Sequence, residues 1–238
     1  MDIEQIVAQC RPSVSLPEMV KALNLLYHEI EAEHYDESHD EIWEQELPIF
    51  RELVGRASQG LKGSPVSLLD YGCGTGDNVR QLIRDGFPRD RITAFDVDRA
   101  SIDLGFDLYR DREEISDLFV ASGKFPFGPA EFGTVYSASV FHVIADDQEF
   151  GAYLAHAWSA LEPGGILFGS TLGLVEGAPR SSGGRGPPRL MTGGELNHQL
   201  TSAGFTRPEM VRRDHVPHHI AGRSDGMCFF EFCTGKPA

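Results

Sequence analysis

The sequence predicts an α/β protein with a doubly wound, mostly parallel seven-stranded sheet, an antiparallel C-terminal strand and an N-terminal helical cap. Three observations support this prediction. From residue 66 onward, short apolar strand-like segments alternate with helix-like segments, and a glycine-rich turn follows the first of them. The chain then ends on two strand-like segments without a helix between them. Parallel neighbours need crossover connections, usually helices, whereas strands that follow each other directly pair antiparallel.

Length and composition describe an ordinary globular protein. At 238 residues, with 41% hydrophobic and 24% charged side chains, the chain is long enough for one main domain with a buried core. Its formal net charge of -15 argues against a DNA or RNA partner, because nucleic-acid binding needs a basic surface. No apolar run approaches the roughly 18 residues that span a bilayer, so no membrane partner is expected.

The first part of the chain is expected to be an acidic helical cap over residues 1–60. Ser15-Leu16-Pro17-Glu18 has the capping-box pattern that begins a helix, and apolar residues follow it at helical spacing. A turn-rich link with Gly60, Gly63 and Pro65 leads into a different pattern. The main domain is therefore predicted over residues 61–238.

The later elements are predicted from hydrophobic spacing and from the turns that flank them. Strands are expected at 66–70, 92–96, 117–120, 134–137 and 166–170, and helices at 78–83 and 150–161. Thr192-Gly193-Gly194-Glu195 is a second capping box, which predicts a helix over 194–203. The final strands are expected at 209–213 and 227–234.

A glycine-rich loop follows the first strand, which ends in Asp70. Gly72, Gly74 and Gly76 let the backbone turn sharply and approach a ligand, and the helix start that follows favours an anionic group. The G-x-G-x-G spacing differs from the dinucleotide and triphosphate fingerprints. The second strand ends in Asp96, where a carboxylate roughly twenty residues past such a loop can accept ribose hydroxyls. These features favour a ribose-bearing ligand with a small anionic end.

Five segments in the same order resemble the motifs of class I S-adenosylmethionine-dependent methyltransferases, of the type that acts on small molecules. They are Leu68–Gly76 for motif I, Ala94–Asp98 for motif II, Phe132–His142 for the fourth-strand motif, Leu161–Gly165 for the turn before the fifth strand, and Ala203–Phe205 for the end of the next helix. The similarity covers residues 66–234. It implies a Rossmann-like sheet and S-adenosyl-L-methionine as the cofactor.

The resemblance also implies roles for individual residues. Asp70 supports the cofactor ammonium group, Asp96 binds the ribose and Val97 packs on the adenine. Ser122 replaces the acidic residue with which many relatives contact the adenine, since the chain has Ala121-Ser122-Gly123 after the third strand. The cofactor-binding residues expected on this basis are Tyr35, Asp70, Gly72, Cys73, Gly74, Gly76, Asp96, Val97, Ser122 and Ser137.

Three residues are candidates for catalysis: His142, Tyr35 and His39. His142 follows the fourth strand, at the edge where ligands of parallel sheets bind, so it is either a general base or a residue that packs against the next helix. Tyr35 precedes the main domain and is expected either to close over the cofactor or to pack. His39 lies on the same helical stripe as Tyr35 and either lines the substrate pocket or is solvated.

Other polar residues are further candidates for a site. Arg180, Arg185 and Arg189 lie in a glycine- and proline-rich segment over 173–189, and they either grip an anionic substrate group or belong to a solvated loop. No metal site is expected, because the histidines at 215, 218 and 219 lack carboxylate–histidine spacing. The four cysteines form no disulfide or metal framework, which favours a cytoplasmic location.

Methyl transfer to an oxygen or nitrogen of a small molecule, such as a secondary metabolite in biosynthesis, is the function that these observations favour. Two alternatives keep the same loop: a different use of the sulfonium, such as intramolecular cyclisation, and a non-catalytic S-adenosylmethionine-binding regulator. A nicotinamide oxidoreductase is a more distant alternative. The sequence leaves open the acceptor, the atom methylated and the choice between monomer and homodimer.

Overall fold

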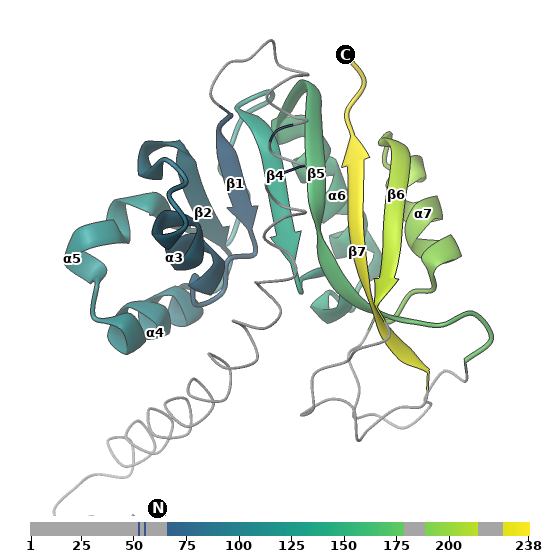
Figure 1. Ribbon diagram of the computed structural model, residues 1–238, viewed down its shortest axis with the longest axis horizontal. Helices are drawn as coiled ribbons and strands as arrows, with labels where there is room; N and C mark the ends of the chain where they lie inside the picture. Colours follow the sequence, from purple (N-terminus) through teal and green to yellow (C-terminus); the bar gives the residue numbers. More distant parts are fainter. Residues whose placement is uncertain (1–51, 53–54, 56–65, 179–188, 214–225) are drawn as a thin grey trace, which may run out of the picture. The chain divides into compact units, whose positions relative to one another are not determined.

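The computed structural model describes residues 52, 55, 66–178, 189–213 and 226–238 (Figure 1). The chain divides into two units, Met1–Pro48 and Ile49–Ala238, and the described residues belong to the second. Tyr35 and His39 lie outside the described residues, as does nearly all of the predicted cap. The cap and its boundary at residue 60 therefore stay predictions.

The predicted seven-stranded sheet is confirmed, with the order β3-β2-β1-β4-β5-β7-β6 (Figure 1). Strands β1 to β5 run parallel to one another, whereas β7 runs antiparallel to both β5 and β6. The strands are β1 Leu68–Tyr71, β2 Ile92–Asp96, β3 Phe119–Ala121, β4 Phe132–Ala138, β5 Leu161–Leu174, β6 Thr206–Arg213 and β7 Met227–Gly235. Fold class and the antiparallel finish thus follow the sequence prediction.

Helices connect β1 to β2, β2 to β3 and β4 to β5, as the alternating pattern predicts, whereas β3 leads to β4 without a helix. They are α3 Asp77–Arg84, α4 Arg99–Tyr109, α5 Arg112–Ile115, α6 Asp147–Ala160 and α7 Gly193–Ser202, with short 3-10 turns η1 Arg89–Arg91, η2 Ser116–Leu118 and η3 Phe141–Val143. In Figure 1, α3, α4 and α5 gather at the β1–β3 end of the sheet. In the described ranges, no helix is long and apolar enough to cross a membrane.

Side chains cap the first turns of helices α7 and α4. The predicted capping box at the start of α7 is present: the Thr192 hydroxyl accepts the Glu195 amide at 3.3 Å, and the Glu195 carboxylate accepts the Thr192 amide at 2.9 Å. Asp98 caps α4 by accepting the Ala100 amide at 3.0 Å. Such caps satisfy amides that the first helical turn leaves without partners.

Strand β5 is longer than the sequence pattern predicts, since it spans Leu161–Leu174 rather than 166–170. It pairs with β7 without interruption from Ile166 to Leu174. Because a buried central strand gains hydrogen bonds on both sides, a partner strand far along the chain extends it through residues such as Gly169 and Gly173, which have weak strand propensity.

Strand order places the site. β1 lies between β2 and β4, so the chain moves outward in opposite directions from β1, and the crevice between neighbouring loops opens at this switch point. The loops that follow β1, β2 and β4 therefore meet at the carboxyl edge of the sheet. Alternation along β1 turns Tyr71 into the main hydrophobic core, which includes α6, and turns Asp70 to the opposite face.

Candidate active site

The loop after β1 has a backbone that only glycine adopts without strain. Gly72, Gly74 and Gly76 have φ values of +83°, +54° and +80°. A Cβ on Gly72 would lie 2.5 Å from Val140 Cγ2, and one on Gly76 would lie 2.5 Å from Phe119 Cε1. A Cβ on Gly74 would meet no atom of the described residues within 4 Å. The outer two glycines are thus required by packing, while Gly74 borders open space.

The amides of this loop are bonded to β2. The Gly72 and Cys73 amides donate to the Phe95 carbonyl at 2.8 and 3.1 Å, and the Gly74 amide donates to Asp96 Oδ2 at 2.8 Å. The other oxygen of Asp96, Oδ1, accepts the Asp98 amide at 2.8 Å. Each carboxylate oxygen has a second lone pair, so Asp96 holds the loop and still has acceptors for ribose hydroxyls.

Asp70 is a completely buried carboxyl group at the end of β1. Within the described part of the chain, neither carboxyl oxygen has a hydrogen-bond partner. Burial, followed by the negative charges of Asp96 and Asp77, raises the pKa of Asp70 to about 8. Because a buried carboxyl group without a partner is costly, this position fits a ligand that brings a cationic group.

Val97 and Ser122 follow the ends of β2 and β3. The Val97 side chain is 66% exposed although it is apolar, and it directly follows Asp96. The Ser122 amide donates to the Asp96 carbonyl at 3.3 Å, and its hydroxyl accepts the Lys124 amide at 3.2 Å. An apolar surface beside a ribose-binding carboxylate fits an adenine ring. Together with Asp70 and Gly74, these residues fit S-adenosylmethionine.

Ser137 is a buried residue of β4. Its buried hydroxyl is 2.8 Å from the Tyr153 hydroxyl, which itself donates to the Tyr71 carbonyl at 2.7 Å. The Tyr153 ring also stacks on Tyr71 with 3.8 Å between centroids. Ser137 is thus engaged in the core beneath α6, and its predicted contact with the cofactor stays a prediction.

Ser139 is a further residue at this edge of the sheet that the sequence does not mark as a site residue. It follows β4 at the carboxyl edge, is exposed, and has a φ of +57°. Its amide donates to the Ser170 carbonyl at 2.8 Å, and the next residue, Val140, packs against Gly72. Left-handed backbone at a residue other than glycine costs free energy and concentrates at functional sites. No local pattern in the sequence marks this conformation.

His142 lies in η3, just beyond β4, and its side chain is buried. Its Nδ1 accepts the Leu172 amide at 3.4 Å and is 3.4 Å from the Thr171 hydroxyl. Burial lowers the pKa of His142 to about 4, so the ring is neutral at physiological pH. Since Nδ1 faces an amide donor, the neutral ring carries its proton on Nε2.

Of the two roles considered for Arg189, a grip on an anionic substrate group does not fit, because its guanidinium is already engaged. It donates to the carbonyls of Ile144 at 2.8 Å and Ala145 at 3.1 Å and to Asp147 Oδ1 at 2.6 Å, and it lies over the Phe150 ring. It therefore ties down the segment after His142 instead of awaiting an anion. Arg180 and Arg185 lie outside the described residues.

Cys73 is a buried free thiol within the loop. Burial, together with the charges of Asp70 and Asp96, raises the pKa of Cys73 far above that of an ordinary thiol. A thiol in this state is not a nucleophile. Its place in the loop agrees with packing, and its contact with a cofactor stays a prediction.

Comparison with known proteins agrees with this geometry. Residues 68–165 match the family model of a methyltransferase domain. A methyltransferase of Penicillium brasilianum is 34% identical over 104 residues, which cover 40% of this chain and 36% of that protein. An Asnovolin E/Chermesin D methyltransferase of Aspergillus novofumigatus is 28% identical over 131 residues, covering 51% and 45%. The chain thus spans less than half the length of these curated relatives.

Solved structures share the fold at low sequence identity. A 1,6-didemethyltoxoflavin-N1-methyltransferase of Burkholderia thailandensis, solved with bound 1,6-didemethyltoxoflavin and S-adenosylhomocysteine, has a TM-score of 0.56 at 21% identity; the match covers 96% of this chain and 94% of that chain. The cyclase SpnF has the same TM-score of 0.56 and covers 73% of this chain and 76% of its own. Residues 68–165 of this chain thus match a methyltransferase domain, and they lie on a sheet that has the fold of solved methyltransferases.

Proposed function

We propose that this chain binds S-adenosyl-L-methionine at the loop after β1 and transfers its methyl group to an oxygen or nitrogen of a small molecule. The observation that carries the proposal is the arrangement of two carboxyl groups around this loop. Asp70 is buried and has no hydrogen-bond partner among the described residues, whereas Asp96 bonds Gly74 and retains free acceptor positions. Asp70 therefore suits an ammonium group, and Asp96 suits ribose hydroxyls.

Different described residues bind different parts of the cofactor in this proposal. Asp70 holds the ammonium group, Asp96 the ribose and Val97 the adenine, while the open side of Gly74 lets the ligand approach the backbone. When bound, S-adenosylmethionine supplies an electrophilic methyl group. The chain accelerates transfer mainly by aligning the acceptor with that group and by excluding water.

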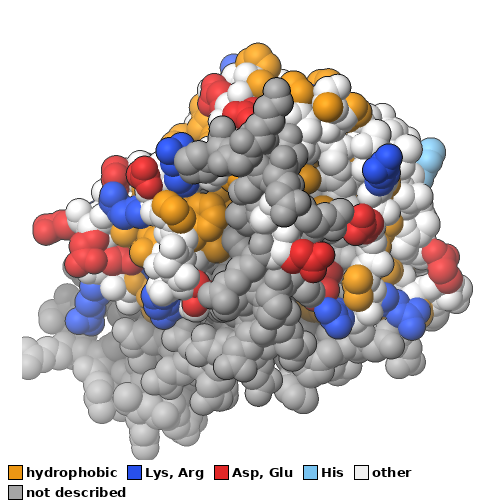
Figure 2. Space-filling model, turned by 45° about the horizontal axis from the view of Figure 1, so that its top comes forward, with side chains coloured by type: hydrophobic (Ala, Val, Ile, Leu, Met, Phe, Trp, Pro, Cys, Tyr) orange, Lys and Arg blue, Asp and Glu red, His pale blue; other side chains and the backbone are white. Residues whose placement is uncertain are grey.

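A small molecule is the acceptor class that the surface and the relatives support. On the face drawn in Figure 2, acidic and basic side chains are interspersed, and the described residues show no broad basic area there. A basic surface is what phosphate backbones require. The names of the matched fungal methyltransferases, among them an O-methyltransferase, support a secondary metabolite.

Ser139 and His142 are the residues that we propose to face the acceptor from the segment after β4, and Tyr35 and His39 remain proposals for the cap. His142 is neutral and weakly basic. A neutral imidazole with its proton on Nε2 suits a hydrogen bond to an acceptor oxygen, and it serves as a general base only for an acidic nucleophile. Ser139 offers an exposed hydroxyl at the same edge.

Incubation of the full chain with methyl-labelled S-adenosylmethionine and a panel of phenols, carboxylic acids and amines tests the function. Label in an acceptor, with formation of S-adenosylhomocysteine, is the expected result. Label found only in methylthioadenosine would instead show another use of the sulfonium. Tight binding of the cofactor without turnover across the panel would favour a regulator.

We also propose a cytoplasmic location and either a monomer or a homodimer. Cys73, in the glycine loop, is a free thiol, which supports a reducing compartment. Cell fractionation tests the location, and light scattering coupled to size exclusion tests the assembly. Recovery with secreted proteins would overturn the first proposal, and a larger oligomer would overturn the second.

A further inference from the structure

A buried arginine lies behind the glycine loop. Arg80, in the first half of α3, is only 7% exposed. Its Nε and Nη2 donate to the two carboxylate oxygens of Asp111 at 2.7 and 2.9 Å, and its Nη1 donates to the Thr75 carbonyl at 2.6 Å. The guanidinium therefore joins the loop to the residue before α5 through three charge-assisted hydrogen bonds.

Aromatic rings hold this guanidinium in place. Its carbon lies 4.3 Å from the centroid of the Tyr109 ring and 5.6 Å from that of Phe119. A Cβ on Gly76 would lie 2.8 Å from Arg80 Nη1, so the guanidinium directly contacts the loop backbone. Packing of this kind leaves the side chain little freedom to reorient.

Helix α4 supports the same part of the loop. A Cβ on Gly105 would overlap the Thr75 carbonyl oxygen, which shows how closely α4 approaches it. The hydroxyl groups of Thr75 and Tyr109 both donate to the Asp77 carboxylate. Hydrogen bonds from α3 and α4 thus converge on the last residues of the loop.

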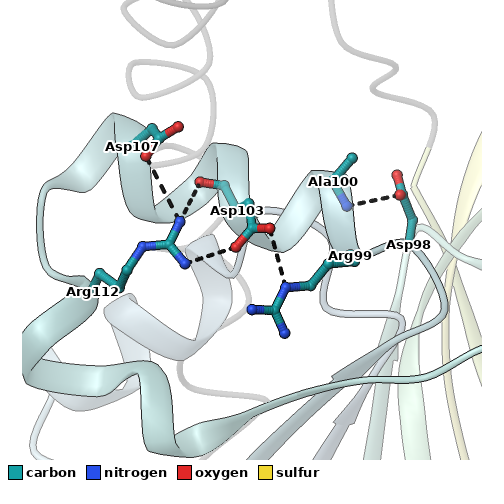
Figure 3. Close-up of polar contacts among 6 residues, drawn as sticks. All are labelled: Asp98, Arg99, Ala100, Asp103, Asp107 and Arg112. Carbon is teal, nitrogen blue, oxygen red and sulfur yellow. Dashed lines mark hydrogen bonds and ion pairs between the residues drawn. The ribbon is translucent and has the colours of Figure 1, made fainter.

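Asp111 is itself anchored through its neighbour. Arg112 Nη1 binds Asp103 at 2.8 Å, and its Nη2 lies 3.8 Å from Asp107, both on α4 (Figure 3). Figure 3 also shows Asp98 capping α4 at Ala100. Because α4 begins three residues after Asp96, the network connects the loop after β1 with the loop after β2.

We infer that Arg80 and Asp111 form a positioning pair that holds the Thr75–Gly76 end of the glycine loop in the shape required by the amino-acid end of the cofactor. The inference rests on the proposed function. Arg80 contacts no ligand position itself and acts through the loop backbone. A lysine at this position keeps the charge but not the planar, bidentate geometry, so it does not replace the arginine.

Isothermal titration of the full chain with two ligands tests the pair. S-adenosylhomocysteine has the amino-acid end, whereas 5′-methylthioadenosine lacks it and keeps the adenine and ribose. In Arg80→Lys and Asp111→Asn, we expect the Kd of S-adenosylhomocysteine to rise about tenfold and that of 5′-methylthioadenosine to change less than about twofold. A general loss of folding would weaken the binding of both ligands equally. A rise in the Kd of S-adenosylhomocysteine alone therefore distinguishes a positioning role from a structural one.

Arg89→Lys is the matched control. Arg89 also binds an aspartate, Asp117, and a backbone carbonyl, that of Glu114, but it lies away from the loop. Both ligands should keep their affinity in this variant. Equal weakening of both ligands in Asp111→Asn, or unchanged affinity in both positioning variants, would overturn the inference. If the wild-type chain binds neither ligand, the proposed function fails and the inference with it; failure of the inference alone leaves wild-type binding intact.

Discussion

The Asp96 carboxylate accepts the Gly74 amide at 2.8 Å and thereby joins the end of β2 to the middle of the loop after β1. These two residues are 22 positions apart in the sequence. In a Rossmann-like site the same carboxylate is expected to bind the ribose, so one side chain shapes the loop and also meets the ligand. Changes at Asp96 should therefore affect both ends of the cofactor.

Asp96→Asn should raise the Kd of S-adenosylhomocysteine at least about tenfold, because an amide has only one acceptor oxygen where the carboxylate has two charged ones. Isothermal titration measures the effect. Asp98→Asn is the matched control, since asparagine caps a helix about as well as aspartate and the Asp98 carboxylate bonds Ala100 and Ser101 of α4. If both variants bind with wild-type affinity, Asp96 does not hold the ribose.

Gly74→Ala should exclude the cofactor while the protein still folds. The added Cβ meets no described atom within 4 Å, so the cost in stability is the left-handed backbone, about 1 kcal/mol. Gly86→Ala has the same cost, with a φ of +85° and open surroundings, but lies at the end of α3. Thermal unfolding should show similar losses in both variants, and only Gly74→Ala should lose binding. Equal binding in the two variants would contradict the open side of Gly74 as the ligand side.

Asp70 should make stability depend on pH. The pKa of its carboxyl group is about 8 in the folded protein and near 3.8 when unfolded. Below pH 3.8 both states hold the proton; as pH rises towards 8 the unfolded state loses its proton while the folded state keeps it, so the free energy of unfolding falls. Asp70→Asn removes this dependence on pH. The free energy of unfolding of the variant, relative to that of wild type, should therefore rise by at least about 1 kcal/mol between pH 5 and pH 8.

Chemical denaturation at the two pH values measures the Asp70 effect. S-adenosylhomocysteine should reduce the difference between the wild-type free energies of unfolding at pH 5 and pH 8, because its ammonium group pairs with the ionised carboxylate. The same ligand should bind Asp70→Asn more weakly. An advantage that is independent of pH would show that Asp70 is not protonated in the folded chain.

His142 should show no titration near neutral pH. Burial lowers its pKa to about 4, so loss of activity through protonation of this ring should occur as pH falls towards 4 rather than near 6.5. The pH dependence of kcat in wild type and His142→Gln measures this. A wild-type inflection near pH 6.5 that disappears in His142→Gln would contradict the buried, neutral ring and favour an ordinary general base.

Ser139→Gly should relieve the left-handed backbone at φ +57° and raise the free energy of unfolding by up to about 1 kcal/mol. The variant lacks the hydroxyl group, so kcat/KM for the acceptor should fall while the Kd of S-adenosylhomocysteine stays unchanged. Ala130→Gly is the control for strain, since Ala130 has a φ of +58° away from the site. Unchanged turnover in Ser139→Gly would remove Ser139 from the acceptor site.

Patterns local in the chain were enough to predict the fold and the meeting of Asp70, the loop glycines and Asp96 at one edge of the sheet. Alternation of strands and helices predicts a parallel sheet, and a parallel sheet brings the ends of its strands to one edge. Asp70, the glycines and Asp96 are therefore predictable together, although they come from different strands. The Thr192–Glu195 capping box was predictable for a similar reason, because all its groups lie within one helical turn.

Only the tertiary structure decided which charged and polar residues support that site. Arg80 and Asp111 are 31 residues apart and meet because α3 and α5 pack beside the same loop. Arg189 donates to backbone carbonyls more than 40 residues earlier in the chain, so these donors are not available to an anionic substrate group. The length of β5 depends on pairing with β7, and the backbone of Ser139 on its bond to Ser170. Sequence periodicity reports contacts within one helix or strand, whereas a long-range hydrogen bond depends on how the elements pack, and no spacing in the sequence contains that information.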